Sequence, residues 1–128
     1  ILEEIQNDLF DLGADLSTPT KSLQTDLRIS DLQVLRIEAE IDELNSDLEN
    51  LHSFVLPGGS KSSSYLHLAR TVCRRAERIS FTLSEETEIN EFALKYLNRL
   101  SDLLFVAARY ENNLGKEDKL WKPGANLA

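Results

Sequence analysis

Residues 54–78 read FVLPGGSKSSSYLHLARTVCRRAER. The Pro57-Gly58-Gly59 turn ends any preceding helix, and the serines of residues 60–64 can cap a following one. Residues 61–78 carry five positive side chains and one negative, although the whole chain has a formal net charge of -8. A reversal of charge at the start of a helix suggests an anion site, for which phosphate is the commonest ligand. The stretch therefore predicts a turn, a capped helix and an anion-binding face.

The helix after the turn is predicted to have two distinct sides when residues 65–79 are placed at about 100° per residue. The side expected to face the core holds Tyr65, Leu68, Ala69, Val72, Ala76 and Ile79. The opposite side holds His67, Arg70, Arg74, Glu77 and Arg78. Arginines at four-residue spacing repel one another in an isolated helix, so something outside the helix should compensate.

Two interpretations of the arginines stay open on pattern alone. Guanidinium groups bind phosphate bidentately, and several together can hold a polyphosphate. They can equally form salt bridges to the acidic helices, each of which contributes little when exposed. Glu77 suits an orienting partner for Arg74 and Arg78 in either case. His67 is more often a structural or solvated residue than a ligand, and Phe54 is more often a core residue or a helix-end staple.

Upstream of the turn, the sequence predicts two helices. Apolar residues recur at helical spacing over residues 1–12, and Pro19 lies beyond the end of that helix. Ser30 can cap a second helix, with Gln33 as its capping-box partner. The apolar seam of the second helix continues at three- and four-residue steps, so this helix is expected to end near Ser53.

Downstream of the arginines, the sequence predicts one more helix and a tail. Residues 81–83 suit a short link, and Ser84 suits the N-cap of a helix that runs to about Asn112. An Asn-Asn-Leu-Gly run then provides the C-cap. Asn98 and Asp102 lie one turn apart on this helix and ordinarily form part of a polar face.

Four predicted helices without a convincing strand indicate an all-α fold, an antiparallel up-and-down bundle of four to five helices. A chain of 128 residues with 41% hydrophobic residues is expected to form one domain, residues 1–128. No apolar run is long enough to span a bilayer, and the net negative charge argues against nucleic-acid binding. The single Cys73 excludes an internal disulfide, and two histidines alone argue against a transition-metal site. No nucleophile elbow or nucleotide-binding glycine motif occurs.

Three blocks of the sequence carry a family resemblance. They are residues 54–59 (FVLPGG), 66–78 (LHLARTVCRRAER) and 97–105 (LNRLSDLLF), and residues 11–16 (DLGADL) resemble an earlier helix end of the same family. Together they resemble the PduO-type ATP:cob(I)alamin adenosyltransferases, also called corrinoid adenosyltransferases. The blocks follow the family's order over nearly the whole chain, and blocks of this length are highly specific.

The resemblance implies a homotrimer with active sites between neighbouring subunits. The family transfers the 5′-deoxyadenosyl group of ATP to the cobalt of reduced cobalamin and releases triphosphate, with Mg²⁺ present. The implied activity is therefore that of an alkyl-group transferase that forms adenosylcobalamin. By position, the ATP-binding residues are Arg74, Arg75, Glu77, Arg78 and Asn98.

The resemblance assigns the remaining site residues to cobalamin and to the subunit interface. Phe54 matches the aromatic residue that closes the lower face of the corrin and excludes the lower axial ligand, which makes cobalt(II) easier to reduce. Asp102 matches an acidic position that supports the cobalamin site. Arg70 matches an arginine that forms an intersubunit salt bridge to an N-terminal aspartate. Phe54 and Arg74 are the expected catalytic residues, and no protein ligand for a metal is expected.

One departure from the family pattern keeps alternatives open. The family's N-terminal Thr-Gly-Asp-x-Gly-type loop, which wraps the ATP phosphates, has no counterpart in this sequence. A non-catalytic cobalamin carrier or ATP-binding bundle that has lost this loop is one alternative, and a structural bundle whose arginines contact proteins is another. A reductase and an adenosylcobalamin-dependent enzyme are the further partners that the resemblance suggests. The expected location is the cytoplasm if the source is bacterial and the mitochondrial matrix if it is eukaryotic.

Overall fold

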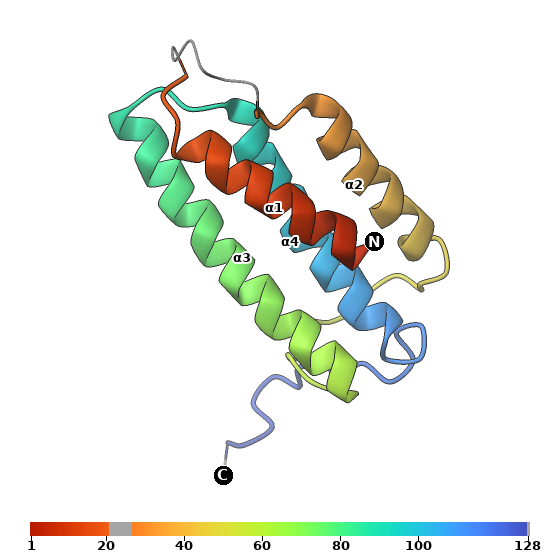
Figure 1. The fold of residues 1–128 in the computed structure, drawn as a ribbon. Coiled ribbons are helices and arrows are strands. Elements are labelled where there is room, and N and C mark those ends of the chain that lie inside the picture. Colours follow the sequence, from red (N-terminus) through yellow and green to blue (C-terminus); the bar gives the residue numbers. More distant parts are fainter. Residues whose placement is uncertain (21–26, 128) are drawn as a thin grey trace.

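A computed structural model describes residues 1–20 and 27–127 and shows four helices (Figure 1). They are α1 (Leu2–Leu16), α2 (Asp31–Asn45), α3 (Lys61–Glu86) and α4 (Glu91–Tyr110). Within the described residues, extended pairing is limited to one antiparallel bridge between Val55 and Leu120. The predicted all-α helical bundle is therefore confirmed.

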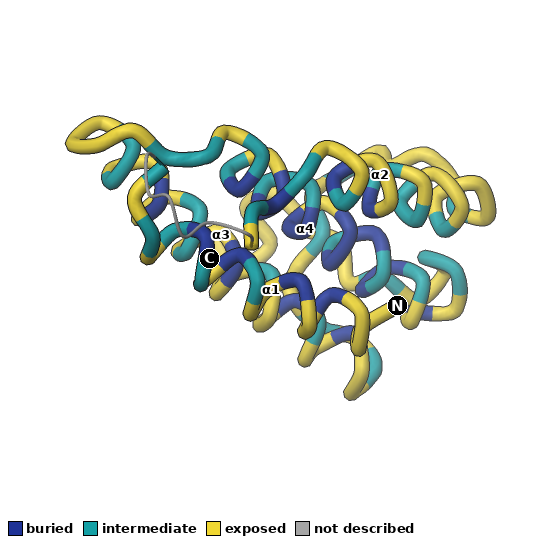
Figure 2. The backbone as a smooth tube through the Cα atoms, turned by 45° about the horizontal axis from the view of Figure 1, so that its top comes forward, coloured by how far each residue is buried: buried dark blue, intermediate teal, exposed yellow. Residues whose placement is uncertain are grey.

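The most deeply buried helix is α4, which packs against both α3 and α2 while α1 lies across it (Figure 1). Buried positions follow α4 along its length, whereas α2 exposes much of its surface (Figure 2). The apolar side chains that α4 buries in the main core are Ala93, Tyr96, Leu97, Leu100, Leu103 and Leu104. Because these side chains are mostly bulky, the helices packed against α4 have limited room for large side chains of their own.

A buried carboxylate on α1, that of Asp8, joins three helices. It accepts hydrogen bonds from the Tyr96 hydroxyl on α4 at 2.8 Å and from Gln33 Nε2 on α2 at 2.9 Å, and it pairs with Arg36. Burial, followed by the hydrogen bond to Asp8, raises the pKa of the Tyr96 hydroxyl, which therefore stays a neutral donor. A buried carboxylate with several donors is stabilised in place, so Asp8 fixes α1 against its neighbours.

A second buried carboxylate, that of Asp15, fixes the other end of α1. It accepts hydrogen bonds from Arg28 Nη1 at 2.7 Å, from the Ile29 amide at 2.8 Å and from Asn90 Nδ2 at 2.7 Å. The donors come from the segment before α2 and from the residue that caps α4. The end of α1 is therefore tied to the start of α2 and to the start of α4.

Three predicted helix boundaries are wrong: the end of α2, the end of α3 and the start of α4. α2 ends at Asn45 and not near Ser53, because the Ser46 hydroxyl donates to the Glu43 carbonyl at 2.7 Å and competes with the helical hydrogen bonds. α3 continues through Ser84 to Glu86, since residues 81–83 contain neither glycine nor proline to interrupt it. The N-cap of α4 is instead Asn90, whose side chain accepts the Phe92 amide.

The predicted caps at the start of α2 and α3 are confirmed. Ser30 and Gln33 form the capping box of α2. Ser60 caps α3, and its hydroxyl accepts the Ser63 amide at 3.1 Å. α4 ends at Tyr110, close to the predicted Asn112, and the chain then turns through left-handed backbone to Gly115. These local features follow from nearby sequence because a cap needs only residues within one turn.

The two predicted sides of α3 are also wrong. Tyr65, Leu68, Val72 and Ile79 are 63%, 60%, 48% and 64% exposed, although they were expected in the core. Six buried or half-buried positions of α3 recur at steps of three or four residues, and we call this line the α3–α4 seam: Ser63, His67, Arg70, Cys73, Glu77 and Ser80. α4 supplies the bulky core residues, so α3 turns small and polar side chains toward it.

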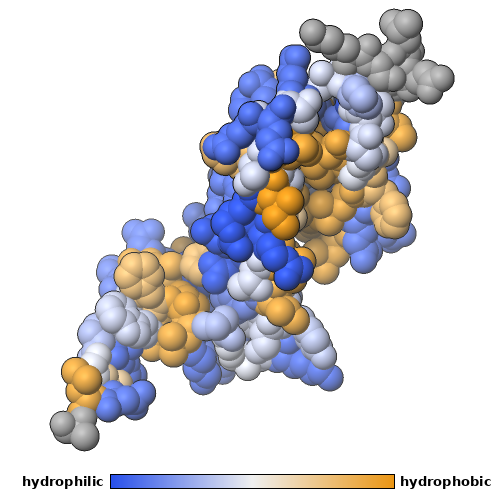
Figure 3. Space-filling view, turned by 90° about the vertical axis from the view of Figure 1, so that its left-hand side faces the viewer, coloured by the Kyte–Doolittle hydropathy of each residue, from blue (hydrophilic) through white to orange (hydrophobic). Residues whose placement is uncertain are grey.

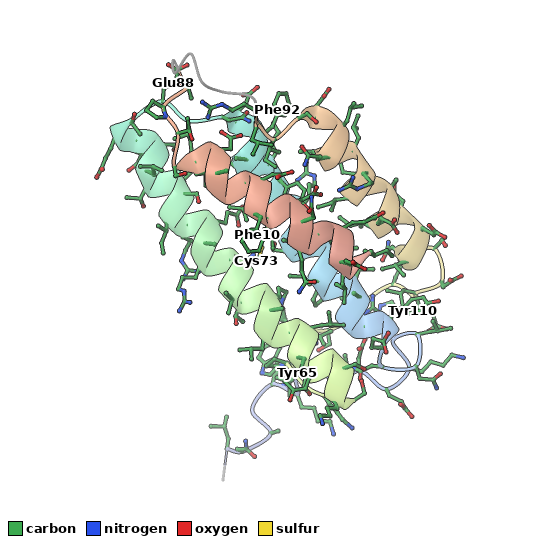
Figure 4. The ribbon with its side chains drawn as sticks, viewed as in Figure 1. Phe10, Tyr65, Cys73, Glu88, Phe92 and Tyr110 are labelled. Atoms are coloured by element: carbon green, nitrogen blue, oxygen red, sulfur yellow. The ribbon has the colours of Figure 1, made fainter. Side chains whose placement is uncertain are left out.

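The apolar side of α3 borders a groove between α1 and α3 instead. The groove has a volume of about 830 Å³, and its lining includes Leu2 and Leu9 from α1 and Leu68 and Val72 from α3. Tyr65, labelled at the start of α3 in Figure 4, also lines it, and Cys73 lies half-way along the helix. Seen from the α3 side, the surface carries a hydrophilic band between apolar patches (Figure 3).

Two further properties concern the described residues only. Within residues 1–20 and 27–127, each helix falls short of the length and apolarity that crossing a membrane requires. The same residues contain no group of three or more histidine, cysteine, aspartate or glutamate side chains that could hold a metal ion.

Candidate active site

A cleft of about 600 Å³ lies where the α3–α4 seam meets the segment before the Pro-Gly-Gly turn. Phe54 and Val55 line it from that segment, Arg70 lines it from α3 and Phe105 lines it from α4. Phe54 is 75% exposed, so the structure does not place it in the core. Two predicted site residues, Phe54 and Arg70, are thus brought to one cleft although 16 positions separate them in the sequence.

Arg70 is held in this cleft by an aromatic contact. Its guanidinium carbon lies 5.2 Å from the centroid of the Phe105 ring, within the range of a cation–π interaction. Its Nε is buried and has no hydrogen-bond acceptor among the described residues. Burial, and then the nearby charge of Arg74, lowers the pKa of Arg70. An anionic partner would offset both effects.

His67 lies one turn before Arg70 and is buried, with 1% of its surface exposed. Its ring packs edge-on against Phe105, with centroids 6.3 Å apart, and neither ring nitrogen has a partner among the described residues. Burial, followed by the charge of Arg70, lowers the pKa of His67, so the neutral imidazole is favoured. Of the structural or solvated role expected for His67, the structure therefore supports the structural one, a packed residue.

Arg74, Arg75 and Arg78 lie farther along α3 and are exposed. Within the described residues, every ion pair draws on an arginine outside α3. The described part of the chain therefore does not neutralise these three guanidinium groups by salt bridges, which was one of the two interpretations of the pattern. A helix rises about 1.5 Å per residue, so Arg70 and Arg78 span roughly 12 Å along the helix.

Glu77 and Asn98 meet across the far end of the seam. Asn98 Nδ2 donates to Glu77 Oε2 at 2.8 Å, and Arg99 Nη1 donates to Asn98 Oδ1 at 2.6 Å. Arg99 Nε in turn forms an ion pair with Glu38 Oε1 of α2 at 2.8 Å. Glu77 is thus hydrogen-bonded to Asn98, and this bond links it to α4 and not to the arginines that flank it on α3.

Asp102 and Cys73 lie between the two ends of the seam. Asp102 is exposed on α4, whereas Cys73 is buried and its thiol donates to the Leu97 carbonyl at 3.3 Å. Burial, then the charge of Glu77, raises the pKa of the Cys73 thiol to about 11. A thiol so rarely ionised is a poor nucleophile, and Cys73 therefore serves as a packing residue.

The C-terminal segment closes the other side of Phe54. The Trp121 amide donates to the Phe54 carbonyl at 2.8 Å, and the Leu56 amide donates to the Lys119 carbonyl at 2.6 Å. The Trp121 and Phe54 rings are 5.7 Å apart and inclined at 62°, an edge-to-face arrangement. Trp121 is therefore held directly beside Phe54 at the edge of this cleft.

The buried side-chain amide of Asn112 holds the turn that follows residues 54–56. Asn112, which is fully buried, accepts the Ser60 amide at 2.8 Å and donates to the Gly58 carbonyl at 3.0 Å and to Ser63 Oγ at 2.9 Å. Gly59 has φ +117°, and a Cβ added there would overlap the Asn112 side chain. The turn is thus held by the end of α4, and only glycine fits at residue 59.

Sequence reasoning missed three contributors to the site: Phe105, Trp121 and Arg99. Phe105 was visible as a large apolar residue on the polar stripe of its helix with Asn98 and Asp102. Trp121 gave no positional signal, because the tail lacks periodicity and its pairing with residue 54 is long-range. Arg99 lies beside Asn98, but its link to Glu38 depends on how α2 packs.

The chain matches the family described as "Cobalamin adenosyltransferase" over residues 1–111. It is 48% identical over 131 residues to a corrinoid adenosyltransferase of Mycobacterium leprae, and the aligned region covers 97% of this chain and 68% of the relative. It is 44% identical over 126 residues to a corrinoid adenosyltransferase of Mus musculus, which covers 94% of this chain and 53% of the relative. The chain thus spans about half to two thirds of the length of these relatives.

Solved structures of corrinoid adenosyltransferases are similar to this chain as well. A variant of the PduO-type ATP:corrinoid adenosyltransferase from Lactobacillus reuteri, solved in complex with cobalamin and ATP, superimposes with a TM-score of 0.87 at 41% identity. That match covers 94% of this chain and 68% of the other. A second variant of that enzyme, complexed with ATP, gives a TM-score of 0.86 at 41% identity. The family match covers most of the chain, and both the curated relatives and the similar solved structures are adenosyltransferases of this family. The chain therefore belongs to the cobalamin adenosyltransferase family.

Proposed function

We propose that this protein transfers the 5′-deoxyadenosyl group of ATP to the cobalt of cob(I)alamin, forming adenosylcobalamin and releasing triphosphate. The observation that carries the proposal is the α3–α4 seam. One end holds an apolar cleft with Phe54, and exposed arginines follow along the same helix. Family relatives named corrinoid adenosyltransferases, and neighbours complexed with cobalamin and ATP, support this division into two substrates.

The arginines act on the leaving group. Cobalt(I) supplies an electron pair to the 5′ carbon of ATP, and the bond from that carbon to the triphosphate oxygen breaks with its electrons leaving on triphosphate. Because cobalt is the nucleophile, the protein only has to align the 5′ carbon and neutralise the departing charge. We assign this role to Arg74, with Arg75 and Arg78 as further phosphate contacts.

Glu77 and Asn98 complete the proposed nucleotide site. Their mutual hydrogen bond fixes both side chains before a ligand arrives. A preorganised pair loses little side-chain freedom on binding, which favours affinity. We assign Mg²⁺ to the triphosphate oxygens, since this ion commonly keeps waters and binds through substrate phosphates and does not need a cage of protein ligands.

Phe54 forms the proposed apolar wall below the corrin. A wall of this kind keeps water and the tethered base away from the lower face of cobalt, and a cobalt(II) centre without that ligand is easier to reduce. Phe105, on the other side of the cleft, extends the same wall. Asp102 supports the cobalamin site from the middle of the seam.

The proposed assembly is a homotrimer with sites between subunits. Arg70 is the residue assigned to brace the interface through an aspartate of a neighbouring subunit. Its buried Nε, which has no acceptor among the described residues, supports this assignment. Residues 1–128 act as a single domain in this assembly. A reductase that supplies cob(I)alamin and an enzyme that uses the product are its proposed partners, in the bacterial cytoplasm or the mitochondrial matrix according to source.

The proposal is tested under anaerobic conditions. The full-length protein is mixed with Mg·ATP and cob(I)alamin, and the absorption spectrum is followed for the cobalt–carbon product. Product formation at a rate that requires the protein is the expected result. If a known corrinoid adenosyltransferase forms product in the same mixture and this protein does not, the proposed activity is wrong. Binding of both substrates without turnover would indicate a cobalamin carrier instead.

A further inference from the structure

The backbone around Phe54 is held by a short antiparallel pairing with the C-terminal segment. Val55 is bridged to Leu120, which places Phe54 opposite Trp121 and Leu56 opposite Lys119. Ser53 Oγ adds a hydrogen bond to the Trp121 carbonyl at 3.0 Å. In an antiparallel pair, directly opposed residues extend to the same face and their Cβ atoms lie about 4.5–5.5 Å apart. The register therefore brings the rings of Phe54 and Trp121 together.

Phe54 has little else to hold its ring. The side chain is 75% exposed, and Trp121 is the aromatic ring that contacts it within residues 1–20 and 27–127. An aromatic side chain in open solvent changes rotamer on the ps–ns timescale. The edge-to-face contact at 5.7 Å restricts that motion and leaves the remaining ring surface turned to the cleft with Arg70 and Phe105.

The C-terminal segment is itself fixed to the rigid end of α4. Asp118 Oδ2 accepts Arg109 Nε at 2.8 Å, and both side chains are buried. The Glu117 amide donates to the Asn112 carbonyl at 2.9 Å. Gly115 has φ +83°, so the chain can reverse here at low cost. Trp121 is therefore presented to Phe54 by a braced segment, three residues beyond a buried ion pair.

We infer that Trp121 is a positioning residue for the adenosyltransferase reaction, which sets the orientation of the Phe54 ring below the corrin. The inference rests on the proposed function of Phe54. The inference goes beyond that proposal because it gives a residue of the C-terminal segment, Trp121, a part in excluding the lower axial ligand of cobalt. Trp121 acts through Phe54, so its loss affects the step that depends on that ring: the use of cobalt(II) substrate with a reductant.

The contact between the Phe54 and Trp121 rings is tested first, in the protein without substrate. Trp121 is the one tryptophan of the chain, so the emission of the intact protein reports its surroundings. Phe54→Ala removes the ring that covers Trp121, and the emission is expected to shift to longer wavelength. Val55→Ala is the matched control, since residue 55 extends to the other face of the pairing. Equal spectra for wild type and Phe54→Ala would overturn the inference whatever the protein catalyses.

The functional test compares two routes to product. In Trp121→Ala, the rate from cob(II)alamin and reductant is expected to fall roughly 2- to 12-fold, the factor that corresponds to loss of one aromatic pair. The rate with pre-reduced cob(I)alamin is expected to change less. Trp121→Phe restores a ring and should recover the first rate. Leu120→Ala removes a neighbouring apolar side chain from the opposite face and should leave the ratio of the two rates unchanged.

The outcomes separate the two proposals. Wild-type protein that forms no product by either route refutes the proposed activity, and the emission test still decides whether the pair exists. Wild-type activity with an unchanged ratio of rates in Trp121→Ala refutes the positioning role. A change of ratio that Leu120→Ala reproduces also refutes it, because the segment as a whole and not the tryptophan ring would then be responsible.

Discussion

The two ends of the α3–α4 seam are held in different ways. At the far end, Glu77, Asn98 and Arg99 form a chain of hydrogen bonds that reaches Glu38 on α2. At the near end, Phe54 is largely exposed, and Arg70 Nε and both nitrogens of His67 lack partners within the described residues. Buried polar atoms are ordinarily hydrogen-bonded, so those without partners indicate where a ligand or another subunit can be bound. The far end is fixed by its own chain, whereas the near end depends on what it binds.

The largest expected effect concerns the arginine between these two ends. Arg74 is exposed without ligand, but bound ATP would cover it, so Arg74→Ala should lower kcat/KM for ATP roughly 30- to 5,000-fold, the factor for about 2–5 kcal/mol lost with one member of a desolvated charge pair. Steady-state kinetics at saturating cob(I)alamin measures this loss. Lys95→Ala removes an exposed cation of α4 and serves as the control. Unchanged ATP kinetics in Arg74→Ala would remove this residue from the site.

The next effect concerns the turn that supports the near end. Gly59→Ala should lower the free energy of unfolding by at least about 2 kcal/mol, because the new Cβ overlaps Asn112 and the backbone has φ +117°. Gly58→Ala is the matched control, since a Cβ there lies 4.0 Å from its nearest neighbour, Lys119 Cγ. Denaturant unfolding of both variants measures the difference. Equal stabilities would show that Asn112 moves aside at little cost.

A smaller effect is expected at the far end. Asn98→Ala removes the donor to Glu77 and the acceptor of Arg99, and it should lower the free energy of unfolding by about 1–2 kcal/mol. Unfolding without ligand measures this, and ATP affinity should fall in the same variant. If Asn98→Ala is as stable as wild type, the hydrogen bonds of Asn98 do not fix the far end of the α3–α4 seam, and the contrast with the near end fails.

Cys73, between the ends, predicts a pH effect. Its folded-state pKa of about 11 lies above the ordinary thiol value of 9.0, so the unfolded chain loses this proton first as pH rises. The stabilisation is therefore fully present below pH 9 and is lost between about pH 9 and 11, at no more than about 1.4 kcal/mol per pH unit. Unfolding of wild type and Cys73→Ala across this range isolates the effect. Parallel curves would contradict it.

The smallest effect on stability is expected at Phe54. The ring is mostly exposed, so Phe54→Ala should lower the free energy of unfolding only by about 0.5–1.5 kcal/mol, the contribution of its edge-to-face pair with Trp121. The same variant should slow product formation from cob(II)alamin more than from pre-reduced cob(I)alamin. Equal slowing of both routes would count against its role as the wall below the corrin.

The four helices, the caps at the start of α2 and α3, and the family were predictable from sequence, but the buried side of α3 was not. Local signals such as the Ser30–Gln33 box and the Ser60 cap depend on residues within one turn, and the structure confirms them. The buried side of α3 was predicted from its apolar residues, which was wrong because α4 already fills the space with bulky side chains. The facing side of α3 therefore carries Ser63 and Cys73.

The site shows the same division. The sequence blocks identified Phe54, Arg70, the three arginines that follow, Glu77, Asn98 and Asp102 as one group. The structure brings Phe54 and Arg70 to one cleft and joins Glu77 to Asn98 by a hydrogen bond between α3 and α4. The blocks could not indicate that Phe105 lines the same cleft as Phe54 or that Trp121 contacts the Phe54 ring, since both residues lie more than 50 positions from residue 54.

By itself, the sequence of this protein determined an all-helical bundle, the caps of α2 and α3 and the family, because these depend on local spacing and on family blocks. The tertiary structure alone decided which side of α3 is buried and which ring lies against Phe54. These depend on the volume that α4 occupies and on the long-range pairing of residues 54–56 with 119–121. Neither the volume that α4 occupies nor this long-range pairing can be inferred from residues within a single turn of helix.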